Sequence, residues 1–318
     1  MKMAVWTALI LCKQKAVILI LCRNEEMDGI NATLENFEEK FNSKFEYPYV
    51  FLNDKKFTQE FQDKLSQTCK DRAKFGRVDA DVWNMPPGID RERAKKSWAD
   101  MRSAGVPYAD MESYHNMCRF FSKSFYSHPL VQEYKFYWRI EPNVRFRCEI
   151  ENDPFDFMAE NNKKYGFVIT IREFMGSIKT LMNTTAKFLM AYYDKLPKAD
   201  LMQFMFDGGE YNGCHFWSNF EIGAFDWLRS KAYNDFMDAL ERAGGFYYER
   251  WGDAPVHSIA ASFLLGRSEV HFFEEIGYTH DTFTHCPKDG KGCDCKPSES
   301  VDFTAFSCLS KYLSDARQ

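Results

Sequence analysis

The most constraining feature of the chain is an uninterrupted aliphatic run, AVILILC at residues 16–22, which ends at Arg23. A run without polar alternation is typical of a strand buried on both faces, as the central strands of parallel sheets are. Residues 27–41 follow with apolar side chains at helical spacing, and YPYVFLN at 47–53 has the pattern of a second strand. The pattern predicts a β-α-β unit.

The rest of the chain continues this alternation. Further strands are expected at 136–140, 165–171, 246–250 and 270–273, and helices near 154–161, 177–193, 232–243 and 256–265. Residues 54–125 are charged and helical in pattern. We therefore predict an α/β fold with a mixed, mostly parallel central sheet flanked by helices. One domain is expected over 16–318, after an apolar leader at 1–15.

Composition excludes one class of partner and leaves another open. The 318 residues carry a net charge of -5, whereas a nucleic-acid binder normally presents a basic face to phosphates. Aromatic residues make up 17% of the chain, which suits both a core and a sugar-binding cleft.

The N-terminus resembles the start of a signal peptide, because Lys2 precedes an apolar stretch that reaches Cys12. No small-residue cleavage site follows, and no uninterrupted apolar run reaches the roughly 18 residues that span a bilayer. We predict no transmembrane helix. Sequons at Asn31 and Asn183 fit a secretory protein.

Four of the ten cysteines lie near the C-terminus, in a loop rich in Lys, Gly, Asp and Pro. Their spacing does not match a zinc finger, so we favour disulfides. The alternative is a structural zinc site made of His285, Cys286, Cys293 and Cys295.

Several longer strings are more specific than composition. They are MCRF (117–120), YWRIEPNV (137–144), YNGCHFWSNFEI (211–222), GGFYYERWGDAPVHSIAA (244–261) and GYTH (277–280). With them the chain resembles the fungal Golgi α-1,2-mannosyltransferase family, from about Leu21 to the C-terminal cysteines.

The resemblance implies a GT-A type nucleotide-sugar-binding fold and a retaining transfer of mannose from GDP-mannose that requires manganese (Mn²⁺). The implied acceptors are mannose-terminated N- or O-linked glycans. It also implies residence in the Golgi lumen, with membrane association through an N-terminal anchor.

The resemblance assigns roles residue by residue. Glu141 and His280 match the metal ligands of the family, and Glu221 matches its candidate nucleophile. Tyr114 matches a catalytic-site tyrosine, and Asp253 matches another carboxylate of the cleft.

These residue types suit the reaction. A divalent cation stabilises the negative charge that develops on a diphosphate leaving group, and mixed oxygen and imidazole ligands suit manganese, with magnesium as a competitor. Arg23 and Arg139 are expected to donate forked hydrogen bonds to the same phosphates. Glu221 either forms a covalent mannosyl intermediate, or it orients the substrate while the acceptor hydroxyl attacks on the same face of the sugar that GDP leaves.

Each assignment has a structural alternative. Glu141 can pair with Arg139 or Arg145, His280 can be a surface histidine, Asp253 can be a helix N-cap, and a buried Glu221 would need a partner such as Arg229.

The chain also departs from the family pattern. It has Ala109, Asp110, Met111 and Lys123 where members usually have glycines. These replacements motivate a second hypothesis, a relative that binds GDP and glycans without transfer.

Overall fold

The computed structural model describes residues 13–192 and 200–315, so most of the apolar leader predicted at 1–15 lies outside the described residues. Among the described helices, none has both the length and the apolar content needed to cross a bilayer.

The main sheet has seven strands in the order β12-β6-β11-β4-β1-β2-β3. Strand β1 pairs in parallel with β2 and β4, whereas β11 is antiparallel to both of its neighbours, β4 and β6. The predicted mixed, mostly parallel sheet is therefore confirmed. The strands are β1 (Ala16–Leu21), β2 (Tyr49–Asn53), β3 (Ala73–Arg77), β4 (Phe136–Arg139), β5 (Arg145–Phe146), β6 (Tyr165–Phe167), β7 (Thr170–Arg172), β8 (Phe206–Asp207), β9 (Glu210–Tyr211), β10 (Cys214–Phe216), β11 (Glu221–Ala224), β12 (Val270–Phe272), β13 (Tyr278–His280) and β14 (Phe283–His285).

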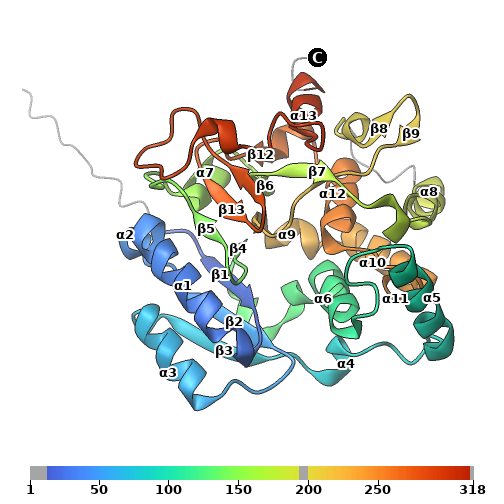
Figure 1. Ribbon diagram of the computed structural model, residues 1–318, viewed down its shortest axis with the longest axis horizontal. Coiled ribbons are helices and arrows are strands. Elements are labelled where there is room, and N and C mark those ends of the chain that lie inside the picture. Colours follow the sequence, from blue (N-terminus) through green and yellow to red (C-terminus); the bar gives the residue numbers. More distant parts are fainter. Residues whose placement is uncertain (1–12, 193–199, 316–318) are drawn as a thin grey trace, which may run out of the picture.

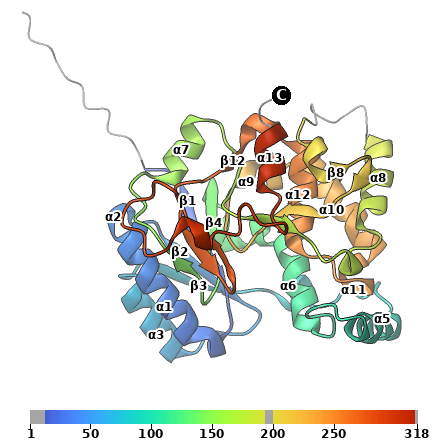
Figure 2. The same cartoon turned by 45° about the horizontal axis from the view of Figure 1, so that its top comes forward.

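Two groups of helices lie at opposite ends of the molecule. In both views α1 and α3 lie together beside β1–β3, and α8, α10, α11 and α12 gather at the other end of the molecule (Figures 1 and 2). The helices are α1 (Met27–Phe37), α2 (Ser43–Phe45), α3 (Gln59–Thr68), α4 (Ala80–Trp83), α5 (Arg91–Ser103), α6 (Glu112–Lys123), α7 (Pro154–Glu160), α8 (Leu181–Tyr192), α9 (Phe225–Leu228), α10 (Lys231–Ala243), α11 (Gly245–Tyr248), α12 (Asp253–Leu264) and α13 (Leu309–Asp315).

Alternation along β4 divides its side chains between the two faces of the sheet. Trp138 packs edge-on against Phe37 of α1, with ring centroids 5.1 Å apart. Tyr137 and Arg139 point to the opposite face, where they contact groups of β11, α6 and α12. That second face carries the polar groups described below.

Two predicted strands were wrong. The run at 165–171 divides into β6 and β7, which belong to different sheets. The run at 246–250 forms the short helix α11 instead of a strand. Here tertiary packing overrides β-propensity, because a Cβ at Gly245 would lie 2.1 Å from the Trp251 ring, and only glycine admits this close turn.

Candidate active site

Two adjoining cavities lie where β1 and β4 end. These strands are parallel neighbours, so the residues that follow them meet at one edge of the sheet. The cavities have volumes of about 190 and 720 Å³ and share lining residues. Six of the seven predicted site residues line one cavity or both: Arg23, Tyr114, Arg139, Glu141, Asp253 and His280.

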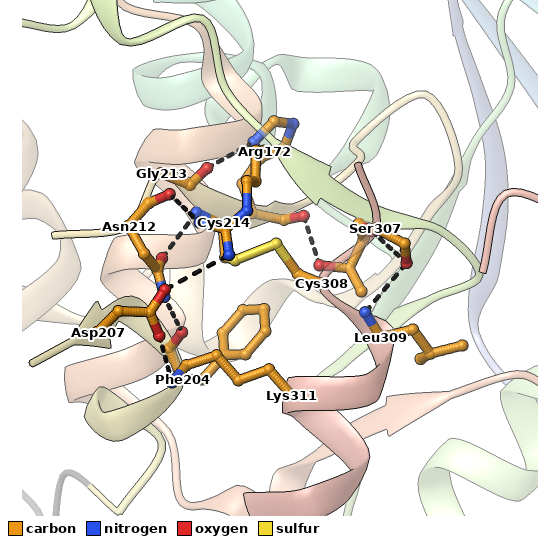
Figure 3. The surroundings of a disulfide bond; sticks show 12 residues. Arg172, Phe204, Asp207, Asn212, Gly213, Cys214, Ser307, Cys308, Leu309 and Lys311 are labelled. Atoms are coloured by element: carbon orange, nitrogen blue, oxygen red, sulfur yellow. Dashed lines mark hydrogen bonds and ion pairs between the residues drawn. A yellow bond between two sulfur atoms is a disulfide. The ribbon is translucent and has the colours of Figure 1, made fainter. Parts of the chain in front are cut away.

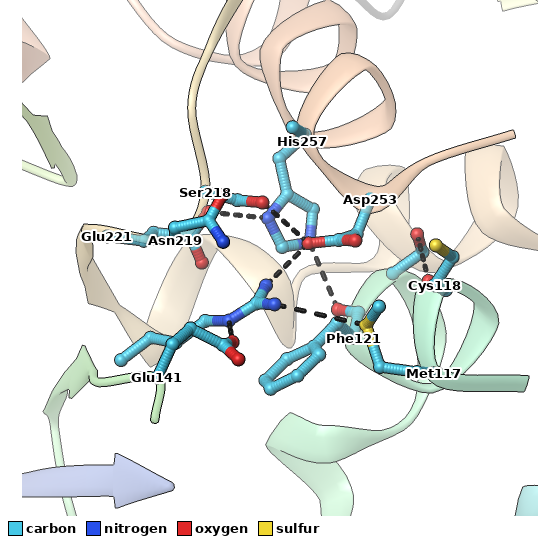
Figure 4. A network of polar contacts seen from close by, with 12 residues as sticks. Met117, Cys118, Phe121, Glu141, Ser218, Asn219, Glu221, Asp253 and His257 are labelled. Atoms are coloured by element: carbon cyan, nitrogen blue, oxygen red, sulfur yellow. Dashed lines mark hydrogen bonds and ion pairs between the residues drawn. The ribbon is translucent and has the colours of Figure 1, made fainter. Parts of the chain in front are cut away.

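Arg139 holds two carboxylates in place. Its side chain is only 3% exposed, its Nε donates to Glu141 at 2.6 Å, and its Nη1 donates to Asp253. The guanidinium also lies 3.5 Å from the centroid of the Phe121 ring. The Glu141 and Asp253 carboxylates both pair with this group, and Figure 4 shows their side chains in the same polar network. The predicted pairing of Glu141 with Arg139 is confirmed, and it coexists with a position on the cavity wall.

Asp253 begins helix α12 but does not cap it. The N-cap is Gly252, and the Asp253 carboxylate accepts hydrogen bonds from Arg139 and, at 2.7 Å, from Ser218. The N-cap hypothesis was therefore wrong, although the first turn of a helix still favours an anion. Burial alone would raise the pKa of Asp253, but the positive charge of Arg139 lowers it overall, so the group is ionised.

Glu221 does not line either cavity. Its side chain is fully buried and accepts hydrogen bonds from the Tyr137 hydroxyl and, at 2.8 Å, from the Tyr165 hydroxyl. It also accepts from the His257 Nδ1 at 2.7 Å (Figure 4). Arg229, the partner considered from the sequence, instead donates to backbone carbonyls. A nucleophilic role for Glu221 stays a prediction, but in this geometry its side chain is 0% exposed and lines neither cavity.

Charge stabilises this buried cluster. Burial opposes ionisation of both groups, yet the positive charge of His257 lowers the pKa of Glu221 and the negative charge of Glu221 raises the pKa of His257. The His257 Nε2 contacts the Phe121 backbone carbonyl at 3.0 Å. The hydrogen bonds of Glu221 thus hold the His257 ring and the Tyr137 side chain together on the face of the sheet that carries Arg139.

A second buried arginine lines the larger cavity and was not identified from the sequence. Arg250 is 5% exposed, its Nη2 donates to Glu173 at 3.2 Å, and its Nη1 donates to the Tyr114 hydroxyl at 3.4 Å. Its Nε has no hydrogen-bond partner. Arg250 belongs to the string FYYER, so the mistaken strand at 246–250 concealed its place in the cavity. An arginine with an unused buried donor can bind a hydroxyl or an anion.

Arg23 lines the smaller cavity. Its guanidinium pairs with Glu26 at 3.2 Å. Because the side chain is also exposed, the guanidinium remains accessible to a ligand. Of the residues that replace family glycines, Met111 also lines this cavity, whereas Lys123 forms an ion pair with Asp238 at 3.0 Å.

Glu141 and His280 can act as metal ligands. Both line the larger cavity. The His280 Nδ1 has no hydrogen-bond partner, and its Nε2 is 3.8 Å from Asp281, which is too far for a hydrogen bond. The imidazole, which stacks on Trp217, is therefore not committed to another group. No cluster of three or more His, Cys, Asp or Glu suited to a metal occurs within residues 13–192 and 200–315. One carboxylate and one imidazole fit a cation whose other ligands are phosphate oxygens and water.

Three disulfides fix the C-terminal segment, as predicted: Cys148–Cys293, Cys214–Cys308 and Cys286–Cys295. The zinc hypothesis was wrong, because the thiols are paired and His285 contacts Asp302 at 2.8 Å. Figure 3 shows Cys308 joined to Cys214 beside Ser307 and Leu309. These bonds hold the segment that follows β13, the strand that ends at His280.

Comparison with known proteins agrees with this geometry. Residues 7–317 match the family described as glycolipid 2-alpha-mannosyltransferase. The chain is 43% identical over 302 residues to the O-glycoside alpha-1,2-mannosyltransferase omh1 of Schizosaccharomyces pombe, covering 93% of this chain and 77% of the relative. It is 44% identical over 307 residues to the alpha-1,2 mannosyltransferase KTR1 of Saccharomyces cerevisiae, covering 94% of this chain and 78% of the relative.

Two solved structures are also similar. The mannosyltransferase Ktr4p from S. cerevisiae, in complex with GDP, superposes with a TM-score of 0.92 at 41% identity, covering 95% of this chain and 82% of that one. Core-mannan synthase A from Aspergillus fumigatus, in an Mn/GDP form, superposes with a TM-score of 0.91 at 38% identity, covering 95% and 85%. The fold is thus of the GT-A type that the resemblance implied. The chain belongs to the glycolipid 2-alpha-mannosyltransferase family and is a mannosyltransferase enzyme.

Proposed function

We propose that the enzyme transfers mannose from GDP-mannose to a mannose-terminated N- or O-linked glycan, forming an α-1,2 linkage with retention of configuration. The observation that carries this proposal is the pair of adjoining cavities, with Tyr114 and Glu141 in both and the carboxylates of Glu141 and Asp253 held by one buried arginine.

The smaller cavity is proposed to hold the nucleotide. It lies beyond the carboxyl ends of β1 and β2, where open α/β sheets bind nucleotides, and it is lined by Arg23, Asn53 and Asp54. Arg23 is exposed and can donate to phosphate oxygens. The GDP in the Ktr4p complex and the Mn/GDP form of core-mannan synthase A support a GDP-linked donor.

In this proposal Glu141 and His280 hold Mn²⁺, which supplies positive charge to the departing diphosphate. Asp253 accepts a hydrogen bond from the acceptor hydroxyl and so orients its oxygen toward the anomeric carbon. As this oxygen bonds to that carbon and the bond to GDP breaks, the hydroxyl proton passes to the departing diphosphate. Arg139 keeps Asp253 ionised and in place. The burial of Glu221 favours attack on the same face of the sugar that GDP leaves, without a covalent intermediate on this residue.

Residence in the Golgi lumen, with membrane attachment, is part of the proposal. The three disulfides support it, because such bonds persist in the secretory pathway and are rare in the cytosol.

The test is manganese-dependent release of GDP from GDP-mannose with methyl α-mannoside as acceptor. We compare wild type with Glu141→Gln and Asp253→Asn, and use Asp226→Asn as control, because Asp226 pairs with Lys164 at the protein surface. Both site variants should lose at least ~100-fold in turnover, as removal of a charged transition-state group does. Binding of GDP by wild type without turnover would support the second hypothesis, a relative that has lost transfer.

A further inference from the structure

The exposed aromatic side chains are not scattered over the surface. Seven large hydrophobic residues are exposed among those described, and three of them, Tyr108, Phe174 and Phe306, line the larger cavity. They are 53%, 45% and 44% exposed. Exposed apolar groups that gather at one site mark a binding surface.

We propose that these three rings, with Phe283, form an acceptor subsite for the sugars that precede the terminal mannose, so that the acceptor is an oligosaccharide of at least two or three units. We call these four residues the aromatic rim. This inference rests on the proposed function and adds the length of the acceptor to it.

Two series of contacts join the aromatic rim to the polar floor of the cavity. On one side Tyr108 stacks on Tyr114 at 4.7 Å, and the Tyr114 hydroxyl accepts from Arg250. Arg250 pairs with Glu173, and the Glu173 carboxylate accepts from the Phe174 backbone N–H at 2.7 Å.

On the other side Phe306 stacks on Phe283, with centroids 5.4 Å apart and planes 7° apart. Phe283 packs edge-on against Trp217, which stacks on His280. The disulfide of Cys308 with Cys214 fixes the backbone two residues beyond Phe306 (Figure 3). These contacts fix the rings of the aromatic rim at the wall of the cavity.

The mixture of groups favours an oligosaccharide over other occupants. A pyranose has an apolar C–H face that stacks on an aromatic ring and a rim of hydroxyls that need polar partners. Arg172, Glu173, Asn219 and Arg250 line the same cavity as the rings. A volume of about 720 Å³ is in the range that holds drug-sized ligands, which are larger than one hexose.

The test compares kcat/KM for methyl α-mannoside and for an α-1,2-linked mannotriose, with saturating GDP-mannose and Mn²⁺. Wild type should prefer the mannotriose by about 10-fold or more, since each stacked ring contributes roughly 2- to 12-fold. Phe174→Ala and Phe306→Ala should each lower this ratio by about 2- to 12-fold, and Phe306→Tyr should restore it. Phe303→Ala is the matched control, because Phe303 is 63% exposed in the same segment and does not line the cavity.

A ratio near one in wild type, or a ratio that both alanine variants retain, would overturn the inference. So would a mannosylated peptide that is preferred over free mannotriose through the same rings. If neither acceptor is mannosylated, the proposed function fails, and Trp fluorescence of the GDP–Mn²⁺ complex then decides the inference separately. Mannotriose binding that weakens in Phe174→Ala and Phe306→Ala supports the subsite, and absence of binding overturns it.

Discussion

Replacing Glu221 by glutamine tests whether this carboxylate supports the site or reacts with the sugar. The change keeps the shape of the side chain and removes a charge that is 0% exposed and bonded to two tyrosine hydroxyls and His257. Breaking a buried ion pair in this way costs about 3–5 kcal/mol. The surface control Glu133→Gln, which only weakens an exposed pair with Lys74, should cost less than about 1 kcal/mol.

The pH dependence of the unfolding free energy tests whether the pair of Glu221 and His257 is responsible for this loss of stability. The pKa of His257 is raised above its ordinary value of 6.5, so its contribution to stability is complete below pH 6.5 and is lost as the pH rises through its folded pKa. The pKa of Glu221 is lowered below 4.5, so its contribution is complete above pH 4.5 and is lost as the pH falls through its folded pKa. The difference in unfolding free energy between wild type and Glu221→Gln, from urea titrations, should therefore be largest between pH 4.5 and 6.5.

Kinetics separate the two roles. A supporting residue acts by positioning Arg139 and α12, so the folded variant should lose about 10- to 100-fold in kcat, and His257→Asn should do the same. Removal of a nucleophile should lower kcat by ~10⁴-fold or more. An unchanged unfolding free energy together with such a loss would refute our interpretation of Glu221.

Three further changes test close packing, a buried histidine and a disulfide bond. Gly223→Ala would place a Cβ 2.5 Å from the Tyr137 ring, so we expect a loss of about 1–3 kcal/mol in urea unfolding; an unchanged midpoint would contradict this. Burial and Lys163 lower the pKa of His271 to about 4, so stability is lost as the pH falls from 6.5 toward 4, and His271→Phe should retain about 1–2 kcal/mol more at pH 5 than wild type, relative to pH 7.5. Replacing Cys214 and Cys308 by serine should cost about 2–5 kcal/mol without added reductant, and equal melting temperatures would show that the bond is not formed.

The fold was predictable where a strand is buried on both faces. The apolar runs that became β1 and β2 have no polar alternation, and the helix pattern between them is long enough to recognise. The run that became β6 and β7 looked like one strand, because hydrophobicity does not reveal where a chain leaves a sheet. Residues 246–250 were mistaken because local β-propensity cannot anticipate the packing of Trp251 on Gly245.

The site was predictable in its position at the sheet edge and less so in its contacts. Glu141 follows a strand, and parallel strands bring their carboxyl ends together, so its place on a cavity follows from the α/β pattern. The place of Arg250 depends on the turn before α12, which was mistaken for a strand.

The partners of Glu221 depend on register, which periodicity alone cannot supply. In the antiparallel pair of β4 and β11, Arg139 lies opposite Glu221 and Tyr137 lies opposite Gly223. Alternation therefore puts Tyr137, Arg139 and Glu221 on one face, and the missing Cβ of Gly223 lets the Tyr137 ring cross the strand to reach the Glu221 carboxylate. A shift of one residue would turn Glu221 to the face that packs on α1, away from Tyr137 and Arg139. The same register that supplies Arg139 to the cavity thus buries Glu221 behind it, and a carboxylate in a highly specific string can serve the site without contact with the substrate.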